Sequence, residues 1–244
     1  MSHKLLVVFL SVLAATLPLF GADEFERTQV TNTERLDFAP GGIIRVNGSY
    51  GSLSVEGWDR PEVEIIVTKS LHFGKSKAQD QDKLRLDSIK VVANRTSPSE
   101  LTISTMLASR HGKWVPFRSS TGGVTVDAEI HLPRDTRLAI HHHTGYVFVG
   151  GVTGDIEASA GRGDIVLMLP GSVSYSIDAK TRLGIVSSDF EGSVRSRYLM
   201  GQRFARTLAP PAQQLYLRMG FGGITLKAVP PEAEASAPVS VSAK

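Results

Sequence analysis

A short unit recurs along this chain: a glycine, one variable residue, and then apolar residues at every second position. The clearest copies are GSLSVEG (51–57), GGVTVDA (122–128), GYVFVGG (145–151), GDIEASA (154–160) and GDIVLML (163–169). Alternating apolar residues are typical of strands with one buried face, and a glycine supplies the tight turn before each strand. The repeat therefore predicts an all-β fold.

The spacing of the units indicates how these strands are arranged. From Gly145 to Gly154 to Gly163 the step is nine residues. Looser copies follow as GSVSYSI (171–177), LGIVSSD (183–189), GSVRSRY (192–198) and GGITLKA (222–228). Because each unit of a repeat buries its apolar face only against its neighbours, the pattern favours a β-solenoid, a single-stranded β-helix-like stack of short Gly-initiated strands. An elongated β-sandwich is the alternative.

The first residues have the pattern of a secretory signal peptide, predicted over 1–22. Lys4 precedes the apolar run LLVVFLSVLAA, and the small pair Gly21-Ala22 follows it. The run is shorter than the roughly 20 residues that a membrane span requires, so we expect no stable membrane span after signal removal. The protein is therefore predicted to be exported and to be periplasmic, on the cell surface or extracellular.

The rest of the chain is predicted to form one β-repeat domain, 23–228, followed by a tail. The domain is less regular over 23–121 and carries the regular repeats over 122–228. The tail, 229–244, is rich in Pro, Ala and Ser, a composition typical of disorder.

Local patterns predict the elements of the less regular part and the breaks in the repeats. Three strands are predicted within 41–70, separated by turns at Asn47-Gly48 and Gly57-Trp58-Asp59. A short helix around 77–86, strands near 87–93 and 100–105, and a basic loop over 107–121 follow. Further along, we expect a turn at 132–135 between two strands and a surface loop over 199–213.

Cysteine and charge exclude several classes of protein. The chain has no cysteine, so no disulfide can cross-link the fold and no lipid-modified cysteine can anchor the protein to a membrane. Without Lys4 the chain carries 26 basic against 24 acidic residues (27 − 1 and 24), and these form no basic run. This near-neutral balance argues against a nucleic-acid partner.

Taken in order, three segments resemble the bacterial "putative adhesin" family of exported β-repeat domains. They are GIIRVNGSYGSLSVEGWDRPEVEIIVTKS (42–70), VDAEIHLPRDTRLAIHHHTGYVFVGGVTGDIEASAGRGDIVLML (126–169) and the degenerate repeats over 171–228. The resemblance implies a β-helical fold and an envelope or extracellular location. It carries no catalytic residue to this chain.

The tripeptide Arg162-Gly163-Asp164 has the sequence of an integrin-type adhesion motif. However, TGDIEAS (153–159) and RGDIVLM (162–168) are consecutive copies of one unit, so the repeat accounts for the glycine and the aspartate. We therefore interpret Asp155 and Asp164 as turn acceptors, and expect any adhesive surface to lie elsewhere.

Three consecutive histidines, His141 to His143, are the most obvious candidates for metal ligands. On a strand, His141 and His143 share one face, where they could bind zinc or copper if His131 came close. His142 is in phase with Leu138 and Ile140, and we expect it to be partly buried near the end of a repeat. We favour a structural role for these histidines over a metal site, and we assign no metal or cofactor to the protein.

A second candidate is the basic aromatic loop SRHGKWVPFRS (109–119), in which Trp114 and Phe117 stand among four basic side chains. Such rings can stack on sugars or, with the cations, hold anionic polymers. The alternative is that they cap one end of the β-stack, which we favour. The loop is still the place where we expect a ligand first.

No pattern in the sequence indicates catalysis. There is no Gly-x-Ser-x-Gly elbow, no His-Glu-x-x-His motif and no cysteine nucleophile. We therefore predict no catalytic, cofactor-binding or metal-ligating residue, and a protein that is not an enzyme. The leading hypothesis is an adhesion or interaction module that recognises an envelope protein or a glycan. A periplasmic scaffold or sensor domain and a carbohydrate-active β-helix enzyme remain the alternatives.

Overall fold

The computed structural model describes residues 28–71, 86, 89–107, 124–196 and 200–230. Every element in these ranges is a β-strand, which confirms the predicted all-β fold. The predicted signal peptide, the basic loop, the tail beyond 230 and, apart from Leu86, the helix around 77–86 lie outside the described residues. Within the described ranges no helix is long and apolar enough to cross a membrane.

The strands follow the chain in this order: β1 (Thr28–Asp37), β2 (Ile43–Tyr50), β3 (Leu53–Trp58), β4 (Glu62–Leu71), β5 (Ile89–Ser97), β6 (Glu100–Leu107), β7 (Val124–Pro133), β8 (Arg137–Gly150), β9 (Ile156–Pro170), β10 (Tyr175–Leu183), β11 (Val186–Ser188), β12 (Ser193–Ser196), β13 (Gln202–Arg206), β14 (Gln213–Phe221) and β15 (Ile224–Val229). They join in one open sheet whose main path runs from β1 to β12.

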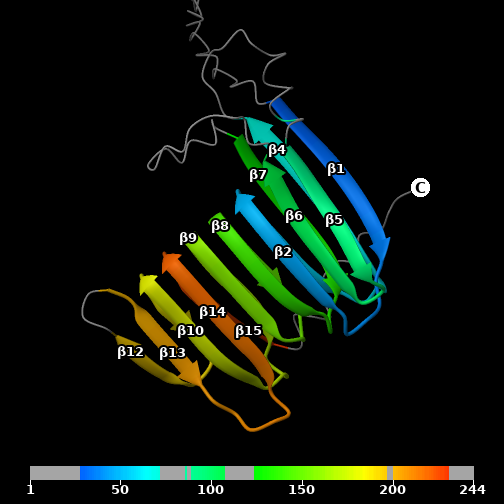
Figure 1. Ribbon diagram of the computed structural model, residues 1–244. Helices are drawn as coiled ribbons and strands as arrows, with labels where there is room; N and C mark the ends of the chain where they lie inside the picture. Colours follow the sequence, from blue (N-terminus) through cyan, green and yellow to red (C-terminus); the bar gives the residue numbers. More distant parts are fainter. Residues whose placement is uncertain (1–27, 72–85, 87–88, 108–123, 197–199, 231–244) are drawn as a thin grey trace, which may run out of the picture.

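Five parallel rungs form the centre of the molecule. In spatial order they are β2 with β3, then β8, then β9, then β14 with β15, and finally β10 with β11. The ribbons of β2, β8, β9, β14 and β10 run side by side in Figure 1. Each rung bends in its middle, so that its first half belongs to one layer of strands and its second half to another. We call these layer A, which contains β2, β14 and β10, and layer B, which contains β3, β15 and β11.

A glycine stands at the bend of every rung. This glycine column consists of Gly51, Gly145, Gly163, Gly222 and Gly184, whose φ angles lie between 121° and 140°. In this region of φ only glycine is comfortable. Along the column the Cα of each later glycine also faces the carbonyl oxygen of its neighbour, and any Cβ would collide with that oxygen. The bend therefore requires glycine for two independent reasons.

The column shows that the nine-residue unit of the sequence is half of a rung. Gly145 and Gly163, which stand at successive bends, are 18 residues apart, and Gly154 between them precedes the start of the next rung. The order of the rungs also differs from the order of the chain, because β14 and β15 insert between β9 and β10. The chain returns to fill this position after it has made the last rung.

Ladders of apolar side chains from successive rungs form the core. In layer A one ladder contains Ile44, Leu138, Ile156, Leu215 and Ile177, all at most 3% exposed. The equivalent ladders of layer B belong to the same hydrophobic cluster. Alternation within each strand therefore places one face of both layers in a shared core.

Five further strands complete the N-terminal end of the stack; they pair antiparallel with one another but join the rungs in parallel, through β7 and β6. β1, β4 and β7 extend layer B beyond β3, and the hairpin of β5 and β6 extends layer A beyond β2. The strands predicted near 87–93 and 100–105 are thus confirmed as β5 and β6. The strand β1 was not predicted, because within it only Val30 and Leu36 are apolar.

Three local predictions are wrong. Asn47-Gly48 lies inside β2 and makes no turn; Gly48 leaves room for the imidazole of His142, which a Cβ would strike. The segment 199–213 was predicted as a loop, but it contains β13. The repeat copy at 192–198 forms β12, which pairs antiparallel with β13 and is not a rung.

Candidate functional site: an exposed ridge along the bend

The tripeptide Arg162-Gly163-Asp164 lies in the middle of β9, at the bend. Asp164 accepts a hydrogen bond from the main-chain N–H of Gly223 on the next rung, with Oδ1 and N 2.7 Å apart. Asp155 does the same for the N–H of Gln214, also at 2.7 Å. Both aspartates are hydrogen-bond acceptors, as expected, but each accepts from a main-chain N–H of the neighbouring rung and not from its own turn. Within the tripeptide, only Arg162 is exposed; Gly163 and Asp164 are half-buried.

Large side chains flank the glycine column on its outer side. One comes from each rung, and we call this set the corner ridge: Tyr50, Tyr146, Arg162, Phe221 and Ile185. Tyr146 is 63% exposed, Phe221 46% and Ile185 65%. Because three of its five side chains are large, hydrophobic and well exposed, the ridge is a candidate binding surface.

Two contacts fix the orientation of ridge side chains. The guanidinium of Arg162 lies over the ring of Phe221, 5.8 Å from its centroid. The ring of Tyr50 meets His143 edge to face, with centroids 5.2 Å apart. The ridge thus presents aromatic surfaces beside a cation in a defined arrangement, which suits stacking and hydrogen bonding with sugar rings.

The ridge has the periodicity of the sheet. Tyr50 is in register with Thr144, Thr144 with Arg162, and Arg162 with Phe221, and neighbouring strands lie about 4.8 Å apart. Tyr146 is not in this row, because it follows its column glycine and is in register with Asp164. Ile185 likewise follows Gly184. The ridge therefore consists of two rows, one on each side of the glycine column.

The ridge residues were not singled out from the sequence, although a signal was present. Each is the immediate neighbour of a column glycine, as in Tyr50-Gly51, Gly145-Tyr146 and Phe221-Gly222. A bulky residue beside each repeat glycine would therefore have marked this surface.

The three histidines alternate as predicted. His141 and His143 are exposed on the outside of β8, whereas His142 is 7% exposed and points into the core beside the bend. His131 lies elsewhere, on β7, where its ring stacks on Trp58 and approaches Glu64 and Glu129. The structure therefore does not bring His131 to the other two, and no group of three metal-binding side chains occurs among the described residues.

Burial controls the titration of His142. Removal of the ring from water lowers the pKa of His142 below its ordinary value, and a hydrogen bond between Nε2 and the carbonyl oxygen of Gly51, 2.9 Å long, offsets part of this effect. The neutral ring donates from Nε2, while Nδ1 faces Gly48. A second proton would place a charge inside the bend.

This burial predicts a loss of stability in mild acid. Since the folded pKa is lowered, His142 contributes its full stabilisation above the unfolded pKa of about 6.5 and loses it as the pH falls below that value. The free energy of unfolding should decrease by up to about 1.4 kcal/mol per pH unit from this one proton. Urea titrations between pH 7.5 and 5 should show a smaller decrease for His142→Gln than for wild type. Equal slopes in the two proteins would contradict the assignment.

The basic aromatic loop, 109–119, lies outside the described residues, so its role as a ligand site stays a prediction.

Comparisons with known proteins complete the description. No family model matches the chain, and no curated protein matches it either. Among solved structures, a "putative cell adhesion protein" from Clostridium sporogenes is similar over 82% of this chain and 100% of its own, with 12% identity and a TM-score of 0.47. A "putative adhesin" from Bacteroides fragilis covers 81% of this chain and 97% of its own, with 12% identity and a TM-score of 0.22.

A third structure, a "putative adhesin" from Parabacteroides distasonis, covers 81% of this chain with 13% identity and a TM-score of 0.23, and 65% of its own length is matched. One of the three structures is thus described as a putative cell adhesion protein and two as putative adhesins.

Proposed function

We propose that this protein is a non-enzymatic binding module, exported to the bacterial envelope or cell surface, that attaches to an extended glycan through the corner ridge. The observation that carries the proposal is the set of large side chains beside the bend, one from each rung and arranged in two rows, with Tyr146 and Phe221 as its most exposed rings. The strand spacing of the five bent rungs sets the spacing of the side chains within each row.

The same geometry supports a binding role over a catalytic one. Asp155 and Asp164, which lie one repeat apart and resemble a carboxylate pair in the sequence, each accept a main-chain N–H. A carboxylate committed in this way is a poor general acid or base, because protonation would break the hydrogen bond that joins two rungs. The ridge instead offers rings and a cation, which bind without reacting.

The proposal predicts that loss of the two rings weakens glycan binding. Purified wild-type protein, incubated with insoluble cellulose, chitin and peptidoglycan, should be retained on at least one of them. The double variant Tyr146→Ser/Phe221→Ser should bind that polymer about tenfold or more weakly, since two stacking contacts are lost. Because both side chains are exposed, its stability should stay within about 0.5 kcal/mol of wild type.

A matched control separates the ridge from general stickiness. Tyr216 is 45% exposed on the outer face of layer A, close to the exposure of Phe221. The variant Tyr216→Ser should bind as wild type does. The proposal would be contradicted by an equal loss of binding in the control and the double variant, or by a wild-type protein that binds none of the three polymers.

A further inference from the structure

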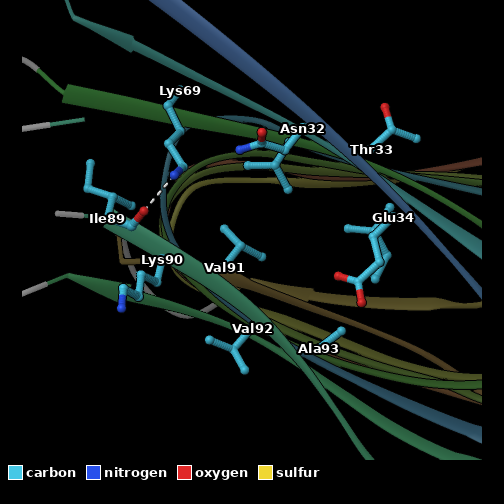
Figure 2. Close-up of a pocket in the computed structure, with 11 residues that line it drawn as sticks. Asn32, Thr33, Glu34, Lys69, Ile89, Lys90, Val91, Val92 and Ala93 are labelled. Atoms are coloured by element: carbon cyan, nitrogen blue, oxygen red, sulfur yellow. Dashed lines mark hydrogen bonds between the residues drawn. The ribbon is translucent and has the colours of Figure 1, made fainter. Parts of the chain in front are cut away.

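Two strands end the layers at the N-terminal end of the stack. Among the described residues β1 pairs only with β4, and β5 pairs only with β6. An edge strand leaves every second N–H and C=O without a partner in the sheet. Between these two edges lies a cavity of about 520 Å³, lined by residues of β1, β4 and β5 (Figure 2).

The lining of this edge groove combines apolar side chains with three charged ones, which are Lys69, Lys90 and Glu34. Ile65 and Val67 of β4 belong to it, together with Val91 and Ala93 of β5. Lys69 reaches across one end, where its Nζ donates to the carbonyl oxygen of Ile89 at 2.6 Å, the bond drawn in Figure 2.

The one acidic residue of the lining comes from β1. Asn32, Thr33 and Glu34 of this strand line the groove and are exposed (Figure 2). Glu34 makes no ion pair within the part of the chain that the structure describes. Its carboxylate is therefore available to a cationic group that enters the groove.

We propose that the edge groove binds an extended peptide strand that adds to β1, with apolar side chains at alternate positions and a Lys or Arg facing Glu34. This inference concerns a different surface from the corner ridge and does not depend on glycan binding. A peptide supplies what the groove lacks: main-chain donors and acceptors for the free edge, apolar side chains for Val67 and Val91, and a cation for Glu34.

Two observations favour a peptide on β1 over other arrangements. A lipid chain would satisfy neither the unpaired main chain nor the carboxylate. The ladder of β1 with β4 is regular over ten residue pairs, whereas the ladder of β5 shifts between Arg95 and Ser97. Because a bulge disrupts further pairing, β1 is the better template for a new strand.

The test uses a fluorescein-labelled peptide, Ser-Val-Thr-Lys-Thr-Val-Ser, whose Val and Lys side chains share one face of a strand. Fluorescence anisotropy should show saturable binding to wild-type protein. The same peptide with N-methyl groups on its Thr residues, which cannot donate main-chain hydrogen bonds, should not bind. A peptide with Glu in place of Lys should bind at least about tenfold more weakly, which corresponds to about 1.4 kcal/mol.

A charge reversal on the protein completes the design. Glu34→Lys should lose the Lys peptide and gain the Glu peptide, whereas Thr31→Lys, at an exposed position of the same strand outside the groove lining, should leave the preference unchanged. Circular dichroism spectra should match wild type for both variants, because both positions are exposed. Three results would overturn the proposal. They are undiminished binding of the N-methylated peptide, an unchanged peptide preference in Glu34→Lys, and a concentration-dependent dimer that binds no peptide.

Discussion

Gly222→Ala is expected to destabilise the protein by about 4 kcal/mol or more, an effect at the upper end for single substitutions. Gly222 stands at the bend of the fourth rung with a φ of 133°. A Cβ there would collide with the carbonyl oxygen of Gly163, which is held in place by the neighbouring strand. The expected readout is a large decrease in the urea midpoint, or failure to accumulate folded protein.

Two other glycines separate the cost in stability of a positive φ from the cost of a steric collision with a Cβ. Gly41 also has a positive φ, 71°, but a Cβ would only approach Asp135 at 3.9 Å. Gly41→Ala should therefore cost about 1–2 kcal/mol from the backbone alone. Gly171 has neither an unfavourable φ nor a severe contact, with Val229 at 3.3 Å, and Gly171→Ala should stay within about 1 kcal/mol of wild type. Equal effects at Gly222 and Gly171 would contradict the role of the column.

Leu167→Ala is expected to cost about 3 kcal/mol, within the range of 2–5 for buried leucines. Leu167 is completely buried in layer B, in register with Val149 on one side and Leu226 on the other. Its removal leaves a cavity between rungs that are held by main-chain ladders on both sides and cannot collapse easily. Chemical denaturation of the two proteins measures this difference.

The neighbouring residue provides the control for this prediction. Met168 follows Leu167 on β9 but faces outward and is 37% exposed. Met168→Ala should change stability by less than about 1 kcal/mol. If Leu167→Ala were as mild as Met168→Ala, the ladders would not be the source of stability that the fold indicates.

The sequence predicts the strands of this protein better than their order. Alternation identifies which side chains of β8 and β9 are buried, and it assigns His142 to the core correctly. It cannot show that β14 and β15 insert between β9 and β10, because that arrangement depends on contacts distant in sequence. Nor does a nine-residue step distinguish a whole rung from half of one, since both begin at a glycine.

The errors of sequence reasoning have physical causes. Asn47-Gly48 has the composition of a hairpin turn, but Gly48 is small because the ring of His142 occupies the space beside it. The strand β1 was missed because it is an edge strand, whose groove-facing Asn32 and Glu34 interrupt the apolar alternation. The corner ridge was missed because its residues are exposed and carry no catalytic or metal-binding motif.

A solution NMR titration with soluble oligosaccharides of the polymer that retains the protein tests the central claim most directly. If the corner ridge binds glycans, amide and side-chain signals of Tyr146, Arg162 and Phe221 should shift together and saturate with one Kd, while signals of the edge groove at Glu34 and Val91 stay unchanged. Shifts that leave the ridge unaffected, or no saturable shift at any residue, would contradict the account.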